Sequence, residues 1–262
     1  MDWDVLVDLL TVTAPIRLEC VRVPAGEFLM GSNQAVDREA SKSELPQHRV
    51  YLAEFYIGKY PVTNAQYAAF VRSAKYEAPS YWDQGGIPAD KGDHPVVHNS
   101  WRDARAFCAW LSQSTGMSFR LPTEAEWEKT ARGTNGRIYP WGDRRPTAEL
   151  CNYDMQVGHT TPAGQYSKNV SPYGALDLAG NVGEWTSSLY RPYPYRADDG
   201  REDLAAEGVR VVRGGAYNLT RWNARCACRL RYAPDRRAGH DGFRVVVSPA
   251  HEETGSASDS EF

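Results

Sequence analysis

The stretch YGALDLAGNVGEWT at residues 173–186 decides how the fold of this chain is interpreted. It lies within residues 134–208, where apolar residues follow neither the period of a helix nor that of a strand. Gly, Pro and Tyr are frequent there, so the backbone has few partners in regular ladders. We therefore expect a long irregular segment that is held in place by side chains or by a bound ion.

The composition is typical of a soluble globular protein with one large domain. The 262 residues are 42% apolar and 24% charged, and neither an internal repeat nor an interdomain linker is visible. Eight Trp and fifteen Tyr among 22 Gly and 16 Pro predict a loop-rich fold pinned by large rings. The net charge of −3 argues against nucleic-acid binding by bulk electrostatics.

Three helix starts carry capping boxes. The pairs are Thr63 with Gln66, Ser100 with Asp103, and Thr123 with Glu126. They open helices that we expect over 63–74, 100–115 and 123–132, the last two ended by Gly116 and Gly133. The second helix has an apolar face made of Trp101, Ala104, Phe107, Cys108 and Leu111.

Strands are expected on both sides of the irregular segment. Residues 17–32 alternate apolar and polar side chains around a turn at Pro24-Ala25-Gly26, and residues 48–63 continue in extended style. Residues 209–217 and 242–248 are predicted strands near the C-terminus. The predicted fold class is α+β, with an N-terminal extension over 1–16, one domain over 17–249 and a disordered tail over 250–262.

The five cysteines do not form a disulfide framework, because they are sparse and odd in number. We expect buried free thiols and no zinc site, with Cys226 and Cys228 on the same face of a strand. The start MDWDVLVDLL has acids where a secretory leader would carry Lys or Arg, and no stretch reaches the roughly 20 apolar residues of a membrane span. The predicted location is cytoplasmic.

Eight motifs in order resemble the formylglycine-generating enzyme, or sulfatase-modifying-factor, family. They are VPAGEFLMGS at 23–32, YPVTNAQYAAF at 60–70, HPVVHNSWRDARAFCAWL at 94–111, FRLPTEAEWEKTARG at 119–133, YPWGD at 139–143, YGALDLAGNVGEWT at 173–186, VVRGGAY at 211–217 and GFRVV at 242–246. The resemblance covers about residues 18–248. It implies a C-type lectin-like fold with small antiparallel sheets and much irregular loop.

The resemblance does not extend to the catalytic residues. The oxidases of the family use a copper-binding cysteine pair shortly after an R-G-G strand. Here AYNLTRWNA at 216–224 follows Arg213-Gly214-Gly215 without a cysteine, and Cu(I) requires soft thiolate ligands. The related sulfoxide synthases carry a three-histidine iron site, whereas the six histidines of this chain are scattered. We therefore predict no copper and no enzyme, with a divergent formylglycine-generating enzyme as the alternative.

The segment NLTRWNARCACRLRYAPDRRAGHD at 218–241 resembles the diversified region of the variable proteins of diversity-generating retroelements. Adenine mutagenesis of AAY codons cannot give Lys, Glu, Gln, Met or Trp, and the segment has only Trp222 from that set. Trp222 argues against its own position being a diversified AAY codon, and the alternative for this position is a fixed aromatic anchor. A frame of Arg213-Gly214-Gly215, Arg225-Cys226, Pro234-Asp235 and Gly242-Phe243-Arg244 surrounds the predicted ligand-binding positions: Asn218, Leu219, Thr220, Trp222, Asn223, Leu230, Tyr232, Ala233, Arg236, Ala238, Gly239, His240 and Asp241.

Two alternatives to a diversified surface stay open. A short arginine-rich loop can lack Lys and Glu by chance, and an interaction module of a signalling system would keep this segment fixed. The predicted partner is an unidentified protein or other macromolecule, bound by a monomer. Nine Arg against two Asp between Arg210 and Arg244 predict either a face for an acidic partner or buried structural ion pairs.

The resemblance also implies a structural calcium site within residues 173–186. The family's ligands match a side-chain oxygen, two backbone carbonyls and a Glu, and such oxygen ligands suit a hard cation. The predicted set is Asp177, Gly180, Val182 and Glu184. Gly183 replaces the usual Trp, and the alternative is that Asp177 and Glu184 only cap turns. The resemblance also implies a second calcium site near Asn152 and Tyr153, which we do not expect here. The stretch that follows, DMQVGHTTP at 154–162, is shorter than in the family and lacks the Asp expected there.

Overall fold

The computed structural model describes residues 9–84 and 86–248. Its three α-helices begin where the capping boxes predicted: α1 (Asn64–Ala74), α2 (Trp101–Thr115) and α3 (Glu124–Arg132). In each helix the N-cap hydroxyl accepts from the N3 backbone N–H, and the N3 side chain accepts from the N-cap N–H. Gly116 and Gly133 end α2 and α3 with positive φ angles of 73° and 67°, so the helix predictions are confirmed.

A five-stranded antiparallel sheet joins the two ends of the domain. Its order is β1 (Leu9–Val12), β2 (Leu18–Val23), β5 (Phe55–Gly58), β11 (Val246–Val247) and β6 (Phe119–Arg120). The strand β1 lies within the predicted N-terminal extension, so the sheet begins before residue 17. Next to it in sequence, β3 (Gly26–Met30) and β4 (His48–Leu52) form a separate hairpin.

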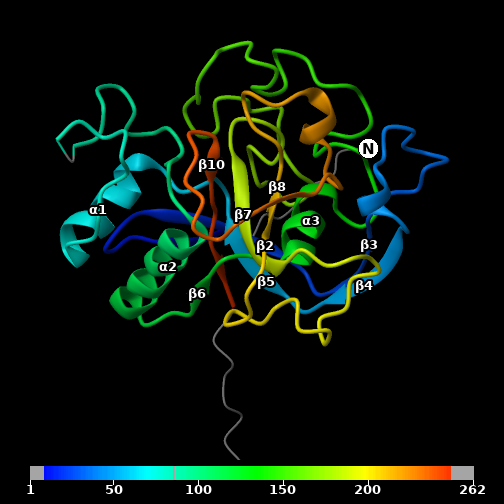
Figure 1. Cartoon of the computed structure of the whole chain (residues 1–262), viewed down its shortest axis with the longest axis horizontal. Helices are drawn as coiled ribbons and strands as arrows, with labels where there is room; N and C mark the ends of the chain where they lie inside the picture. Colours follow the sequence, from blue (N-terminus) through cyan, green and yellow to red (C-terminus); the bar gives the residue numbers. More distant parts are fainter. Residues whose placement is uncertain (1–8, 85, 249–262) are drawn as a thin grey trace, which may run out of the picture.

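A second sheet carries the C-terminal half. Its order is β10 (Asp241–Gly242), β7 (Gly183–Leu189), β8 (Arg210–Arg213) and β9 (Leu230–Tyr232), with β10 parallel to β7 and the other pairs antiparallel. In Figure 1, β7 runs through the middle of the molecule, with α1 and α2 on one side and α3 and the β3–β4 hairpin on the other. The prediction that residues 134–208 lack regular structure is wrong for β7. All seven of its side chains are buried, so the strand shows no alternation.

Two further strand predictions need correction. Cys226 and Cys228 do not share a strand, because they follow the 3-10 helix η2 (Arg221–Ala224) in a turn that precedes β9. Residues 242–248 do not form one strand, because β10 ends at Gly242 in one sheet and β11 begins at Val246 in the other. A second 3-10 helix, η1 (Lys42–Glu44), lies before β4.

The main core is built on the apolar face of α2. All five residues predicted for that face are buried. The ring of Phe107 contacts those of Tyr67, Trp110 and Phe243 with centroid distances of 5.8, 5.5 and 5.4 Å. This packing joins α1, α2 and the C-terminal strands into one domain. Among the described residues no helix is long and apolar enough to cross a membrane. The tail predicted over 250–262 lies outside the described residues.

Candidate ligand-binding surface

Residues 218–241, here called the variable segment, connect β8 to β10 and include η2 and β9. The segment folds back against Gly215, which lies just before its start. A Cβ there would lie 2.8 Å from the backbone carbon of Asn223, and the φ of 69° also favours glycine. The second glycine of the R-G-G motif is therefore required for this close approach of two backbone stretches.

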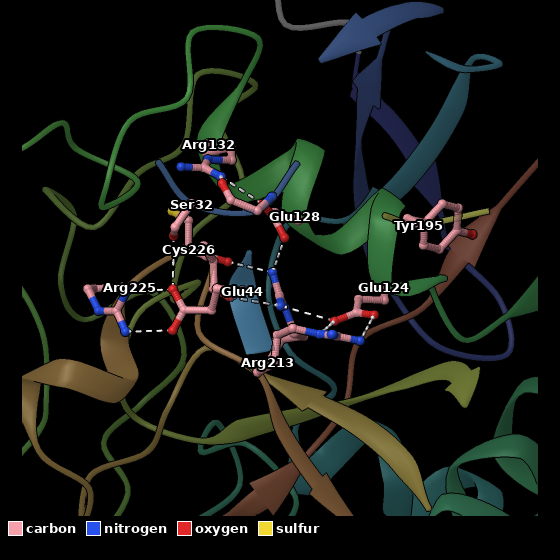
Figure 2. A network of polar contacts seen from close by, with 12 residues as sticks. Ser32, Glu44, Glu124, Glu128, Arg132, Tyr195, Arg213, Arg225 and Cys226 are labelled. Atoms are coloured by element: carbon pink, nitrogen blue, oxygen red, sulfur yellow. Dashed lines mark hydrogen bonds and ion pairs between the residues drawn. The ribbon is translucent and has the colours of Figure 1, made fainter. Parts of the chain in front are cut away.

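Buried arginines attach the variable segment and the strand before it to the rest of the domain, and Figure 2 shows two of them, Arg213 and Arg225, beside their acidic partners. Arg213 donates to Glu124 at 3.1 Å and also to Glu128, which in turn pairs with Arg132 of α3. Arg229 forms a two-pronged contact with Glu124 at 2.6 and 2.9 Å. The side chains of Arg213, Arg229 and Glu124 are all 0% exposed. The segment is thus tied to helix α3 by charges that water does not reach.

Two more buried pairs complete this attachment. Arg225, directly after η2, donates to Glu44 through both terminal nitrogens at 2.7 Å. Arg244 donates to both oxygens of Glu184 at 2.6 Å, and Trp127 donates to the same carboxylate at 2.7 Å. Removing one partner of such a buried pair is strongly destabilising, because the other charge is left uncompensated. Arg213, Arg225 and Arg244 of the predicted frame are therefore fixed by the fold, whereas Asp235 of the same frame is exposed.

The predicted binding positions differ in exposure. Three are exposed: Thr220, Trp222 and Ala233. Nine are partly buried: Asn218, Leu219, Asn223, Leu230, Tyr232, Arg236, Ala238, Gly239 and His240. Asp241 is buried, with a side chain only 1% exposed, and it pairs with Gly183 between β10 and β7. Its display on the surface is therefore a wrong prediction, since strand pairing turns this side chain inwards.

Leu230 and Tyr232 also contribute to packing. Both lie in β9 and pack against the main core, and the ring of Tyr232 contacts Trp185 edge-on at 6.3 Å. The guanidinium of Arg236 covers the other side of Tyr232 at 3.5 Å from the ring centroid. These two predicted binding positions are therefore partly buried and present only part of each side chain to a ligand.

A polar cluster occupies the end of the variable segment. Arg236 donates to Asp241 at 2.9 Å, and its second nitrogen lies 3.1 Å from Nε2 of His240. Because a guanidinium only donates, Nε2 of His240 must accept, and its proton resides on Nδ1. The Asn218 side chain lies 3.2 Å from that Nδ1 and has a buried oxygen without a partner. Turning the Asn218 amide over would let this oxygen accept the proton of His240.

Titration of this cluster differs from that of free side chains. Burial lowers the pKa of His240, and the charge of Arg236 lowers it further. Burial raises the pKa of Asp241 to about 7, although the charge of Arg236 opposes this shift. One oxygen of Asp241 has no hydrogen-bond partner. Asp241 is therefore close to a change of charge near neutral pH, whereas the lowered pKa favours the neutral form of His240.

The arginine excess of the segment is largely compensated. Arg221 pairs with Glu39, Arg236 with Asp241, and Arg237 with Asp103 and Glu77. Among the arginines from 210 to 244, buried structural pairs account for Arg213, Arg225, Arg229 and Arg244. The sequence left open whether the arginines form a face for an acidic partner or buried structural ion pairs. Buried ion pairs are confirmed for these four arginines, so these four do not form a basic face.

The sequence did not single out two exposed apolar residues beside the segment. Asp154 and Met155 donate their backbone N–H groups to the carbonyls of Leu219 and Tyr217 at 2.8 and 2.7 Å. This places Met155 and Val157, which are 57% and 40% exposed, next to the variable segment. Their signal in the sequence is weak, because isolated apolar residues in a loop are ordinary on protein surfaces.

The five cysteines are free and buried, as predicted. Burial raises the pKa of Cys226 to about 12, and it also raises the pKa of Cys228. A thiolate is the form that binds metals and reacts as a nucleophile. Residues 216–224, where the resemblance led us to look for a copper-binding cysteine pair, contain no cysteine.

The predicted calcium ligands are in two different situations. One oxygen of the buried Asp177 accepts from the N–H of Gly164 at 2.6 Å, and the other has no partner. Burial raises the pKa of Asp177 to about 6. Glu184 is not free in this arrangement, because Arg244 and Trp127 occupy both of its oxygens. The described residues also contain no group of three His, Cys, Asp or Glu side chains arranged to hold a metal. Glu184 would therefore have to give up its contacts with Arg244 and Trp127 to bind an ion, and calcium binding stays a prediction.

The fold, with its C-terminal segment attached by buried ion pairs, is that of a C-type lectin-like domain of the formylglycine-generating-enzyme type. The model of the Sulfatase-modifying factor enzyme 1-like domain matches residues 12–249, and the chain belongs to this family.

Sequence relatives include both enzymes and an inactive member. The formylglycine-generating enzyme of Streptomyces coelicolor is 32% identical over 91% of this chain and 92% of its own length. The inactive C-alpha-formylglycine-generating enzyme 2 of Mus musculus is 30% identical over 87% and 85%. The hercynine oxygenase of Mycolicibacterium smegmatis is 31% identical over 86% of this chain, which spans only 60% of that protein.

Two solved structures share the fold over nearly their whole length. PvdO from Pseudomonas aeruginosa superposes with a TM-score of 0.74 and 26% identity, covering 89% of this chain and 95% of its own. Variable protein 1 of Treponema denticola superposes with a TM-score of 0.73 and 25% identity, covering 92% and 99%. The sequence relatives thus include proteins named as enzymes, and the proteins of the same fold include one named as a variable protein.

Proposed function

We propose that this chain is a non-catalytic ligand-binding protein whose variable segment is an exchangeable recognition surface. The observation that carries the proposal is the division of that segment into two sets of residues. Arg225 and Arg229 are buried in ion pairs, as is Arg213 just before the segment, whereas Thr220, Trp222 and Ala233 are exposed. Side chains on a rigidly held loop can be exchanged without unfolding the scaffold. The likeness to the Treponema variable protein supports the same function.

The contacts of a ligand would be mainly apolar and hydrogen-bonding. Trp222, with Arg221 stacked 3.7 Å from its ring centroid, offers a large exposed ring, and Met155 is a second exposed apolar side chain, beside Tyr217. Aromatic and arginine side chains at such positions commonly dominate the energy of interfaces. An acidic partner is less favoured by this surface than the sequence alone suggested, because Arg221 and Arg236 already have acidic partners.

The flanking DNA tests this proposal directly. A diversified gene would be followed by a near-copy of codons 218–241 that differs at adenines, together with a reverse transcriptase gene. Absence of both would contradict diversification. Sequences from close strains distinguish a diversified surface from an interaction module of a signalling system, since such a module would keep residues 218–241 unchanged.

The second candidate is a divergent formylglycine-generating enzyme, which the 32% identity to the Streptomyces enzyme favours. It requires a pair of reactive thiols, whereas Cys226 and Cys228 are buried with raised pKa values. Copper-dependent oxygen consumption with a cysteine-containing peptide would support this candidate and overturn the binding proposal. The cytoplasmic location and the monomeric state stay predictions, to be tested by cell fractionation and by light scattering.

A further inference from the structure

A cavity of about 370 Å³ lies beside α2, β6 and the loop that follows β7. Most of its wall is apolar, from Cys108, Ala109, Phe119, Leu121 and Leu204. In Figure 1, β6 and the loop after β7 (yellow) lie at the lower edge, whereas η2 (orange) lies at the upper edge. The cavity is therefore separate from the η2 end of the proposed recognition surface, and its volume is that of a small-molecule site.

Glu202 contributes a negative charge to this wall. Its carboxylate accepts from the hydroxyls of Ser187, Ser188 and Tyr195 at 3.0, 2.5 and 2.8 Å. No Lys or Arg nitrogen in the described part of the chain lies within ion-pair distance of it. Burial raises the pKa of Glu202. A carboxylate has about four lone-pair positions, so one position is left for a donor from a ligand.

Arg105 contributes a positive charge to the same wall. Its guanidinium lies over the Trp101 ring at 4.7 Å and donates weakly to the carbonyl of Leu204 at 3.5 Å, with no acidic partner among the residues 9–84 and 86–248. The other guanidinium of the wall, Arg120, is already neutralised by Glu126 through two contacts of 2.6 Å. The cavity thus presents one carboxylate and one guanidinium, each without an oppositely charged partner.

We propose that this cavity binds a small zwitterion with an apolar body, in the chemical class of the free apolar α-amino acids. The ammonium group of the ligand donates to Glu202, its carboxylate accepts from Arg105, and its side chain lies against Phe119 and Leu121. A ligand with only one charge would leave the other wall charge uncompensated in a mostly apolar site, which is unfavourable. The zwitterion compensates both.

The test is isothermal titration of the full chain with L-leucine, L-isoleucine, L-methionine and L-phenylalanine, and with analogues of each that lack the amine or the carboxylate. We expect at least one amino acid to bind and its analogues to bind about tenfold or more weakly, as the loss of a charge-assisted contact implies. If none of the four binds, or if an analogue binds as tightly as its parent, the proposal is overturned.

Two variants locate the site. Glu202→Gln and Arg105→Gln should each weaken binding about tenfold, whereas Arg102→Gln, an exposed arginine of the same helix, should leave it unchanged. The amide oxygen introduced by Glu202→Gln can still accept from Ser188 and Tyr195, and its NH2 group can donate to the hydroxyl oxygen of Ser187, so the melting temperature checks that the fold is kept. Ala109→Trp adds bulk at a wall position and should abolish binding. Unchanged affinity in Ala109→Trp would place the ligand elsewhere and overturn the assignment.

Discussion

Arg225 binds Glu44 through two contacts of 2.7 Å, although 181 residues separate them in the chain. Asp37 accepts a third contact from Arg225 at 2.7 Å. Burial on its own would raise the pKa of Glu44, but the hydrogen bonds and charge of Arg225 lower it, so the carboxylate is ionised at neutral pH. Because Arg225 directly follows η2, this pair fixes the end of the 3-10 helix that carries the exposed Trp222.

Replacing Glu44 with Gln should destabilise the protein by about 3 kcal/mol, because a buried guanidinium loses its main counter-charge. The free energy of unfolding from urea titration measures this loss. The matched control is Glu27→Gln, since Glu27 pairs with Arg49 at the surface, where both side chains are more than half exposed. The control should change stability only slightly, and an equal effect of the two substitutions would show that the buried pair does not anchor η2.

Exposed positions of the variable segment should accept exchange. The triple variant Thr220→Asp, Trp222→Tyr and Ala233→Ser should change the free energy of unfolding by no more than about 0.5 kcal/mol per site. The three side chains are exposed, and none of them takes part in a buried ion pair. Thermal unfolding with matched protein concentrations provides the measurement.

The contrasting variant is Arg229→Ala within the same segment. It leaves Glu124 without one of its two buried arginine partners and should cost about 3–5 kcal/mol. If the triple variant unfolds as readily as Arg229→Ala, the segment is not divided into frame and exchangeable residues, and the recognition proposal loses its structural basis.

The cysteines should resist modification in the native protein. Burial raises the pKa of Cys20, Cys108, Cys151 and Cys226 to about 12, and the thiolate is the reactive form. Iodoacetamide at pH 8 should therefore label none of the five stoichiometrically until denaturant is added, as mass spectrometry would show. Rapid native labelling of both Cys226 and Cys228 would instead support a reactive pair and the enzymatic alternative.

Local signals explain why the helices could be predicted from the sequence. A capping box is formed by residues three positions apart, so Thr63, Ser100 and Thr123 each carry the information for a helix start. The fold class could be predicted because eight motifs occur in the same order as in the family that the chain resembles. The strand β7 was missed because both of its faces are buried in contacts with distant segments, which removes the alternation that identifies a strand.

The candidate surface was only partly predictable for the same reason. The frame arginines could be named, but their partners Asp37, Glu44 and Glu124 lie 89 or more residues away, and no spacing rule connects them. Asp241 was placed at the surface because nothing local shows that it pairs with Gly183. Met155 was overlooked because its position beside Leu219 depends on backbone contacts between two loops.

Asp241 gives a pH dependence with a definite sign. Its pKa is raised to about 7 in the folded state, against about 3.9 for an unperturbed Asp. Between these values the folded state holds the proton more tightly, so this group reduces stability as pH rises from about 4 to about 7. In Asp241→Asn this contribution is absent, and the stability of the variant relative to wild type should increase by roughly 2–4 kcal/mol over that range.

Unfolding titrations of both proteins at pH 4, 5.5 and 7 measure that difference. His240, which also titrates nearby, is present in both proteins and largely cancels in the comparison. The substitution Asp235→Asn provides a control at an exposed carboxylate of the same segment and should give a difference that is flat with pH. A flat difference for Asp241→Asn as well would mean that this carboxylate is not buried as described.

Calcium should raise the melting temperature if Asp177 is a ligand, because an ion that binds only the folded state stabilises it by mass action. The partnerless oxygen of Asp177 is the available ligand, whereas Glu184 would have to exchange Arg244 for the ion. The increase should be larger at pH 7.5 than at pH 5, since the pKa of Asp177 is raised to about 6 and calcium requires the ionised form.

Asp177→Asn should remove the increase in melting temperature, and Asp154→Asn, at an exposed position, should retain it. Equal melting temperatures in calcium and in chelator at pH 7.5 would contradict calcium binding and would mean that Glu184 stays paired with Arg244.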